Sequence, residues 1–232
     1  MTTTYESYTP EEQRPTRVAV VHAGTSTPSS TGMLAGRMAE AAASRGAELG
    51  MDVQTIMLDL KTLATDITTA IVSQHISAPL REAIQTLGEA DAMIAATPVY
   101  KAGASGLFTS FFQILDSDLL IGTPVAVGAT GGSPRHALVV DDQLRGLFAY
   151  MRTVTVPTSL YADPDDWTSA AFGDRITRAA TELMALASGR FRDTVRGQTW
   201  HKYQHSYGSA GGAELEIDLD TDLMRLATGL GS

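Results

Sequence analysis

Short apolar segments and helix-favouring segments alternate five times between residues 17 and 191 of this chain. Most of the apolar segments are continuous runs rich in valine and alanine. Continuous runs of this kind are typical of strands that are buried on both faces, with helices as the connections between them. The alternation therefore predicts a doubly wound α/β domain built around a parallel sheet.

The expected elements follow one another without an internal repeat. Strands are expected at residues 17–23, 51–58, 92–96, 124–130 and 153–160. Helices are expected at residues 33–49, 60–87 with a break near Ser77 and Pro79, 105–116, 139–151 and 168–191. The right-handed crossover rule leaves few topologies for this order, and a five-stranded sheet with the strand order 2-1-3-4-5 is one of them.

Three segments are expected along the chain. Residues 1–15 are polar and show no apolar periodicity, so we expect a disordered N-terminal lead. Residues 16–191 hold the α/β domain. Residues 192–232 are basic and aromatic, then glycine-rich, then amphipathic, and we expect an appended arm that is a candidate for an interface between subunits.

The composition excludes several kinds of chemistry. The chain has no cysteine, which excludes disulfides, thiolate metal sites and thiol nucleophiles. Its formal net charge of −9 disfavours a nucleic-acid partner. No apolar run approaches the ~20 residues that span a bilayer, and no signal peptide is evident, so we expect a cytoplasmic protein without a membrane partner. No metal site is expected either, and any redox chemistry must come from a bound cofactor.

The first expected strand ends in Gly24 and a run of small hydroxyl residues that reaches Thr31. This loop precedes a helix, and free N–H groups together with the helix dipole make such a position suitable for an anion. The hydroxyls can donate to phosphate oxygens, although neither a dinucleotide fingerprint nor a P-loop lysine is present. The pattern favours a monophosphate held by neutral donors. An N-cap followed by a polar loop is the alternative interpretation.

A second loop, residues 96–106, follows the third expected strand. Its glycines allow the backbone to approach a planar ligand. Tyr100 can stack on a ring, and Lys101 can place a positive charge near an anionic group. An ordinary connecting loop with Tyr100 packed on the surface is the alternative.

A third loop, residues 129–136, follows the fourth expected strand and contains Gly131 and Gly132. Arg135 and His136 can face a second ligand, although a lone histidine is more often structural than catalytic. Ligands of doubly wound sheets bind beyond the carboxyl ends of the strands, so the three loops converge on one cleft. A phosphate loop beside two flat walls is what flavin mononucleotide (FMN) requires.

These loops resemble those of the NADPH-dependent FMN reductases. The resemblance covers residues 17–190 and rests on Thr97-Pro-Val-Tyr-Lys-Ala-Gly-Ala-Ser-Gly106, on Thr130-Gly-Gly, and on His136 followed by Asp141 and Asp142. Within the family, the chain is most similar to the reductase components of two-component flavin monooxygenase systems, in particular those that serve luciferase-like monooxygenases. The family implies a flavodoxin-like sheet and, as cofactors, FMN with NADPH or NADH as co-substrate.

The resemblance also implies the roles of individual residues. The phosphate loop would comprise Ser26, Ser29, Ser30 and Thr31. The walls of the isoalloxazine ring would comprise Pro98, Val99, Tyr100, Lys101, Thr130, Gly131 and Gly132. No catalytic side chain is expected, because hydride passes from the nicotinamide to the flavin. Lys101 and His136 are candidates for electrostatic or nucleotide contacts.

One extra residue between Lys101 and Gly106 is implied relative to shorter members of the family. In the alkanesulfonate-type reductases the extra residue is a tyrosine that forms a π-helix at a tetramer interface. We align it with Ala104, and an insertion of this kind is usually seen as a π-bulge near a functional site. The apolar helix 105–115 also suggests contact between subunits, in a homodimer or homotetramer.

The function implied is an NAD(P)H-dependent FMN reductase that supplies reduced flavin to a partner monooxygenase. Two alternatives from the same fold are a quinone, azo or chromate reductase that retains FMN and a non-enzymatic electron carrier like flavodoxin. The carrier is less favoured, because the loop after the third strand holds Lys101 and few acids. A flavin-free receiver needs a carboxylate where this chain has Thr97 and Pro98.

Overall fold

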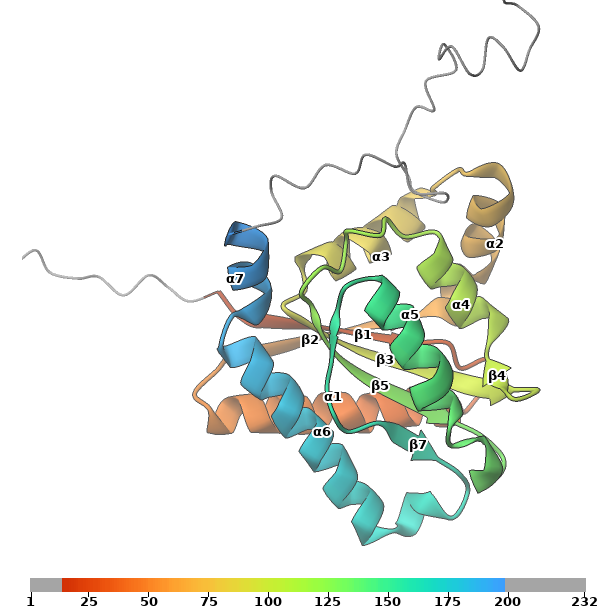
Figure 1. The fold of residues 1–232 in the computed structure, drawn as a ribbon. Helices are drawn as coiled ribbons and strands as arrows, with labels where there is room; N and C mark the ends of the chain where they lie inside the picture. The colour runs from red at the N-terminus through yellow and green to blue at the C-terminus, as the bar shows by residue number, and fades with distance from the viewer. Residues whose placement is uncertain (1–13, 199–232) are drawn as a thin grey trace, which may run out of the picture.

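Five parallel strands form the centre of the computed structural model, which describes residues 14–198, with helices on both faces (Figure 1). The strands are β1 (Thr16–His22), β2 (Val53–Asp59), β3 (Ala92–Tyr100), β5 (Pro124–Thr130) and β6 (Val154–Thr155). Their order is β2-β1-β3-β5-β6, which confirms the predicted flavodoxin-like 2-1-3-4-5 arrangement. Residues 1–13 and 199–232, which include most of the expected lead and arm, lie outside the described residues.

Two short strands extend this sheet. β4 (Gly103–Ala104) pairs with β3 in antiparallel orientation, and β7 (Leu160–Ala162) pairs with the carboxyl half of β5. The fifth strand, expected at residues 153–160, is thus divided into β6 and β7. Pro157 lies between the two pieces and has no N–H to donate to the ladder.

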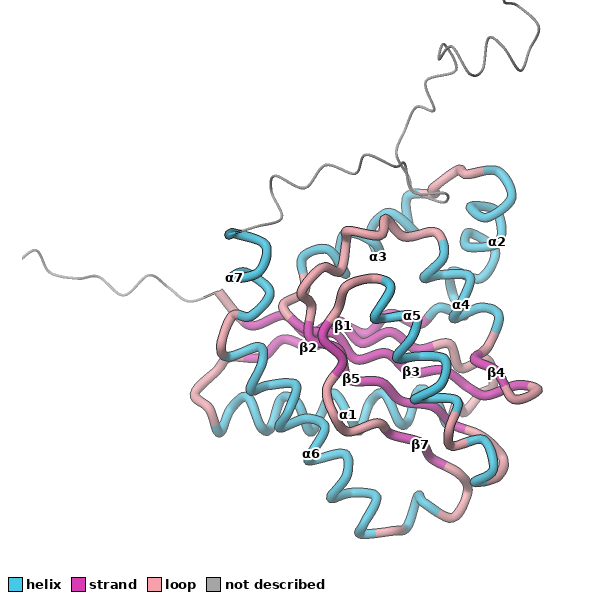
Figure 2. The backbone as a smooth tube through the Cα atoms, viewed as in Figure 1, coloured by secondary structure: helices cyan, strands magenta, loops and turns pink. Residues whose placement is uncertain are grey.

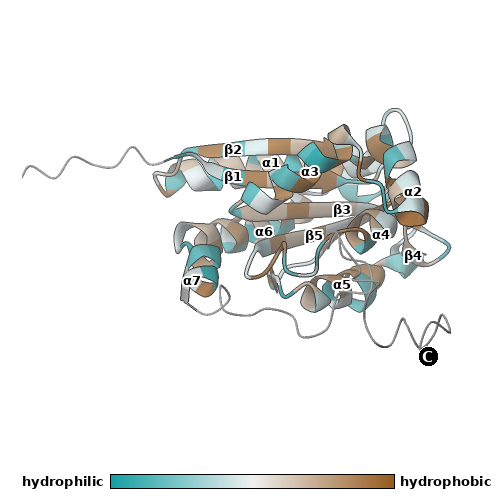
Figure 3. Cartoon of the chain, turned by 90° about the horizontal axis from the view of Figure 1, so that it is seen from above, coloured by the Kyte–Doolittle hydropathy of each residue, from teal (hydrophilic) through white to brown (hydrophobic). Residues whose placement is uncertain are grey.

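Two helices cover one face of the sheet and four cover the other (Figure 2). The first face is covered by α1 (Ser30–Glu48) and α6 (Ala170–Ser188). The second is covered by α2 (Ala64–Ser73), α3 (Ala78–Glu89), α4 (Gly106–Gln113) and α5 (Arg145–Tyr150). Side chains of β1 alternate between the layers, since Val18 and Val20 pack on the first and Ala19 and Val21 on the second. Hydrophobic segments accordingly follow the central strands in Figure 3.

Serine side chains fix where four of these helices begin. Ser29, Ser77, Ser105 and Ser169 each accept a hydrogen bond from the backbone N–H three residues later. This contact satisfies one of the N–H groups that the first turn leaves unpaired. The helix expected at residues 33–49 therefore begins earlier, at Ser30.

The phenylalanines of α4 pack inside the protein. Phe108 and Phe111 are fully buried, and Phe112 lies edge-on to Phe148 of α5 at a centroid distance of 5.0 Å. The sequence suggested that these side chains face another subunit, and that interpretation is wrong for them. The layer formed by α5 covers them instead, a contact that helical periodicity alone does not reveal.

Helix α7 (Phe191–Gln198) packs at the amino edge of the sheet, at the opposite end from the β4 hairpin (Figure 1). Arg192, at the start of the expected arm, is 6% exposed and donates to the carbonyl oxygens of Gly88, Ala90 and Leu119. Burial lowers the pKa of the Arg192 guanidinium to about 10, so the group stays charged at neutral pH. The Arg192 side chain thus joins α7 to the junction of α3 and β3 and to the loop between α4 and β5, which lie far away in the sequence.

We predict that Arg192→Met lowers the free energy of unfolding by about 2–4 kcal/mol, because buried carbonyls lose their donors. Urea denaturation measures the loss. Arg190→Met is the matched control, since Arg190 is exposed and pairs only with Asp193 on its own helix turn among the described contacts. The control should change stability by less than about 0.5 kcal/mol. Equal losses in the two variants would contradict the role of Arg192.

Candidate functional site

A cleft of about 290 Å³ opens at the carboxyl edge of the sheet, where the loops after β1, β3, β5 and β7 meet. Its lining residues are Gly24, Thr25, Ser26, Ser30, Thr31, Pro98, Val99, Tyr100, Thr130, Gly131, Gly132, Ala162, Pro164 and Trp167. The structure thus brings the predicted site residues together, except for Ser29 and Lys101. The cleft is near the small end of ligand pockets, which typically hold roughly 300–1,000 Å³.

Ser29 serves the loop after β1 as a structural residue. Its hydroxyl oxygen accepts from the Gly32 N–H at 3.0 Å and so caps α1, and the side chain does not line the cleft. A Cβ atom on Gly24 would lie only 1.8 Å from that oxygen, so glycine is required there. The expected donor role therefore falls to Ser26 and Ser30, which line the cleft.

One hydroxyl pair joins the two sides of the cleft. Thr31, at the start of α1, is 2% exposed, and its Oγ1 lies 2.7 Å from Oγ1 of Thr130 at the end of β5. These residues are 99 positions apart in the sequence. Their contact holds the phosphate-loop side against the wall formed by β5.

Lys61 brings a positive charge to the loop after β1. It belongs to a 3₁₀ helix, Leu60–Leu63, that follows β2, and its Nζ donates to Oγ1 of Thr27 at 3.1 Å. Sequence reasoning missed this residue because it lies 34 positions after the loop that it contacts. The only available signal was its place just beyond the carboxyl end of the predicted second strand.

His22 lies beneath the same loop without adding charge at neutral pH. It is buried, and its Nδ1 is 3.7 Å from Oδ1 of Asp59. Burial lowers the pKa of the His22 imidazole, and the nearby Asp59 carboxylate opposes this shift only in part. The ring is therefore neutral at pH 7. Lys61 is the cationic side chain whose contact with the loop is established.

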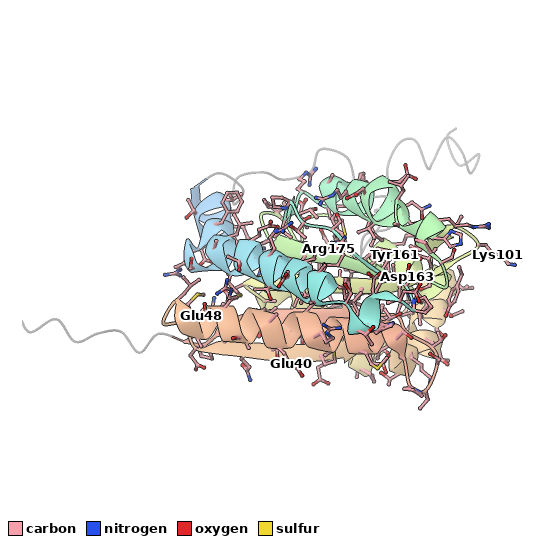
Figure 4. The ribbon with its side chains drawn as sticks, turned by 90° about the horizontal axis from the view of Figure 1, so that it is seen from below. Glu40, Glu48, Lys101, Tyr161, Asp163 and Arg175 are labelled. Carbon is pink, nitrogen blue, oxygen red and sulfur yellow. The ribbon has the colours of Figure 1, made fainter. Side chains whose placement is uncertain are left out.

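Tyr100 spans the mouth of the cleft. Its hydroxyl lies 3.0 Å from Oγ1 of Thr25, which belongs to the loop on the opposite side, and about half of the residue is exposed. Pro98 is buried and Val99 is half-buried beside it. Lys101, by contrast, lies at the hairpin tip on the edge of the molecule, outside the cleft lining (Figure 4). The chain reverses direction at Lys101, so this residue does not continue the cleft wall that Pro98, Val99 and Tyr100 form.

Gly131 permits a close approach by Tyr161 of β7. A Cβ atom on Gly131 would lie 2.2 Å from the Tyr161 hydroxyl oxygen, whereas one on Gly132 would meet no atom within 4 Å. The Tyr161 hydroxyl donates to the Ser133 carbonyl at 2.6 Å. Burial, followed by the charge of Asp163, raises the pKa of the Tyr161 phenol, which stays a neutral donor. Tyr161 and Asp163 are labelled next to each other in Figure 4.

Trp167 adds an aromatic side chain to the cleft that the sequence did not assign to it. It belongs to the 3₁₀ helix Asp166–Thr168 and packs edge-on to Phe172, at a centroid distance of 6.4 Å. Nothing in the local sequence indicates this position, because it depends on how β7 brings the following loop back to the carboxyl edge. A conspicuous tryptophan beside a proline and several acids was the only hint.

The expected π-bulge near Ala104 is also corrected. Gly103 and Ala104 form β4, and Ala104 pairs with Val99 across a hairpin. Within the described residues, a π-helix occurs instead at Val140–Leu144, immediately before α5. The segment after Lys101 cannot form a helical insertion because it is paired as a strand until Ser105 caps α4.

A second hollow, of about 510 Å³, adjoins the hairpin. It is lined by Ala102, Arg135, His136, Leu138, Val139, Asp141, Asp142 and Gln143. His136 thus faces this hollow rather than the cleft. Within residues 14–198, no cluster of three potential metal ligands occurs, and no helix has the length and apolar character needed to cross a membrane.

Comparison with known proteins gives a consistent result. The family model for NADPH-dependent FMN reductase matches residues 16–168. The chain is 34% identical over 174 residues to the NADH-dependent FMN reductase SfnF of Pseudomonas fluorescens, covering 74% of this chain and 89% of the relative. It is 33% identical to an FMN reductase (NADPH) of Pseudomonas aeruginosa, covering 76% and 95%.

Solved structures agree with this similarity. An oxidoreductase from Corynebacterium diphtheriae is 40% identical with a TM-score of 0.75, covering 76% of this chain and 99% of that one. The apo form of the NADH:FMN oxidoreductase EMOB is 26% identical with a TM-score of 0.64, covering 73% and 88%. A flavodoxin, WrbA-like protein from Agrobacterium tumefaciens, 20% identical over 75% of this chain and 98% of that one with a TM-score of 0.51, shares the fold.

We predict that Gly131→Ala lowers the free energy of unfolding by about 1–3 kcal/mol, because the added methyl group displaces Tyr161. Gly132→Ala should leave stability nearly unchanged, since its methyl group meets open space. Urea denaturation without added ligand measures both. Combining Gly131→Ala with Tyr161→Phe should recover part of the loss, as the closest clashing atom is then absent. The prediction fails if the two alanine variants are equally stable.

Proposed function

The chain belongs to the NADPH-dependent FMN reductase family, and on that premise we propose that it supplies reduced FMN to a partner flavin-dependent monooxygenase. It is an NAD(P)H:FMN oxidoreductase, with FMN as the flavin and NADPH or NADH as the electron donor. Hydride transfer from the nicotinamide to bound or exchanging FMN is the reaction. The partner is taken to be a luciferase-like monooxygenase, and the site of action the cytoplasm.

The residues that line the two ends of the cleft suit FMN, and this supports the proposed assignment of its residues. At one end, the hydroxyls of Ser26 and Ser30 lie beside the N-terminus of α1, where a phosphate is stabilised by N–H groups and the helix dipole. At the other end, Pro98, Val99 and the glycines after β5 form flat walls. The close approach of Gly131 to Tyr161 shows that one of these walls tolerates no added side chain.

The side chains around the cleft bind and orient rather than exchange protons. When bound, FMN supplies the hydride acceptor, at N5 of its ring system. Thr130 and the backbone after β5 would hold one side of the ring, and Pro98 with Val99 would hold the other. Trp167 and Pro164 line the wall nearest β7. No carboxylate, histidine or lysine is among the described lining residues, and direct hydride transfer requires none.

The neighbouring hollow supplies contacts for the dinucleotide. Arg135 and His136 line it beside Leu138 and Val139, whose apolar surface suits a nucleoside. Asp141 and Asp142 also line it, so a phosphate group is expected only beside Arg135. Lys101 lies at the hairpin next to this hollow and adds a positive charge there. Arg135, His136 and Lys101 are proposed as nucleotide contacts and not as catalytic residues.

The open cleft is compatible with a flavin that leaves after reduction. Tyr100 covers the mouth with one hydroxyl contact, and half of this residue is exposed. The loop 96–106 resembles that of the reductases of two-component systems, which supports delivery of reduced flavin to a partner.

We also propose that residues 16–191 form the FMN-binding domain and that it assembles as a homodimer or homotetramer. Leu138 and Tyr150, 75% and 74% exposed on either side of the π-helix, offer apolar surface for that assembly.

The activity is tested by oxidation of NADPH and NADH in air, with and without FMN. Flavin-dependent oxidation with either nucleotide supports the assignment, and its absence with both overturns it. Release is tested by anaerobic reduction followed by rapid desalting. Reduced flavin in the small-molecule fraction supports delivery to a partner, whereas flavin retained on the protein favours the quinone, azo or chromate reductase alternative or an electron carrier.

We predict that Lys61→Gln raises the dissociation constant of FMN about three- to tenfold at low ionic strength, because the phosphate loses a nearby positive charge. Quenching of flavin fluorescence measures the binding. Riboflavin, which has no phosphate, should bind both proteins equally, and Lys61→Arg should retain the affinity for FMN. Arg178→Gln removes one exposed charge from α6 and is the matched control. An equal loss with riboflavin would show that Lys61 does not act on the phosphate.

A further inference from the structure

The hairpin that joins β3 and β4 contains two strained residues. Lys101 and Ala102 have φ angles of 52° and 61°, in the left-handed region that residues with a Cβ atom rarely adopt. Only two residue pairs, Val99 with Ala104 and Tyr100 with Gly103, join its strands. So short a ladder offers little to offset the strain in the hairpin, which extends from the end of β3 (Figure 2).

Gln143 provides support from outside the hairpin. Its Oε1 accepts from the backbone N–H of Ala104 at 3.0 Å, and its Nε2 donates to the carbonyl oxygen of Ala102 at 3.1 Å. One side-chain amide therefore contacts the backbone on both sides of Gly103, as the peptide group of a neighbouring strand would. The contact spans 39 to 41 positions in the sequence.

The π-helix fixes the position of Gln143. It comprises Val140–Leu144, and both terminal residues are about 1% exposed, anchored in the core under the sheet. Gln143 lies between these anchors and faces outward. Widened helical turns of this kind often occur at functional sites, where they redirect a side chain.

The supported hairpin forms the wall between the two hollows. Pro98, Val99 and Tyr100 of its first strand line the cleft, whereas Ala102 and Gln143 line the second hollow. Tyr100 also reaches Thr25 across the cleft. A displacement of the hairpin would therefore move the ring wall and the residue at the mouth of the cleft together.

We propose that Gln143 is a positioning residue for the flavin, which holds the strained hairpin in the conformation that lines the cleft and so sets how tightly FMN is held and how fast it leaves. This inference rests on the proposed contact between FMN and residues 98–100. Without the two amide hydrogen bonds, the strain at Lys101 and Ala102 favours rearrangement of the hairpin. The ring wall is then less often formed, whereas Ser26 and Ser30 at the phosphate end have no hydrogen bond to the hairpin among the described contacts.

The test is Gln143→Met, which keeps the length of the side chain but removes both hydrogen bonds. We expect the dissociation constant of FMN to rise about five- to thirtyfold and its dissociation rate to increase. The KM for FMN should rise, whereas kcat at saturating FMN should change little. Without flavin, trypsin should cleave faster after Lys101, as identified by peptide mass. Gln113→Met, at the exposed end of α4, is the matched control.

Two further variants separate this role from general destabilisation. Gln143→Glu retains the acceptor for the Ala104 N–H but loses the donor to Ala102, so it should also weaken binding. Ala102→Gly removes strain at a φ of 61° and should at least halve the loss of affinity when combined with Gln143→Met. Rescue by a change in hairpin strain would place the effect in the hairpin and not in the packing of the π-helix.

The outcomes distinguish this inference from the proposed function. If the wild-type protein binds no FMN, the proposed function is wrong, and the inference falls with it. If the wild type binds FMN and Gln143→Met binds and releases it equally well, only the role of Gln143 is wrong. Equal trypsin cleavage after Lys101 in the two proteins would likewise overturn the proposed hairpin contact.

Discussion

Burial of a parallel sheet between two layers of helices is the constraint on which the rest of this structure depends. The middle of β3 is apolar and inaccessible from either face, so the backbone hydrogen bonds of the ladder cannot be exchanged for water. Because the strands are parallel, every loop that follows a strand emerges at the same edge. The loops after β1, β3 and β5 meet there as a consequence of the burial of the sheet.

Small polar contacts then give the cleft its shape. The Ser29 cap fixes where α1 begins, and the position of its oxygen requires glycine at position 24. The Thr31–Thr130 pair sets the spacing of two walls, and the Tyr161 hydroxyl occupies the space beside Gly131. Hydroxyl groups and glycines thus have different tasks in the same loops, and a serine-rich segment divides into one structural cap and several groups that line the cleft.

The hairpin and the π-helix show how a strained segment is held by a distant one. Lys101 and Ala102 have unfavourable backbone angles that their own short ladder does not offset. The amide of Gln143 contacts the hairpin from a helix that is anchored in the core at both ends. One side chain rather than a continuous strand therefore supports this wall of the cleft.

The sequence by itself determined the alternation of strands and helices and the three loops at one edge, because these depend on apolar periodicity and on the type of residue that follows each strand. The resemblance to the family, which the residues of these loops carry, selected one strand order among the few allowed and indicated most residues of the cleft. Only the tertiary structure decided the roles of Ser29, Lys101 and Ala104, and it alone placed Lys61, Trp167 and Gln143. Each of these depends on a contact with a distant segment or on the direction of a turn. Local residue patterns carry no information about such contacts until the chain has packed.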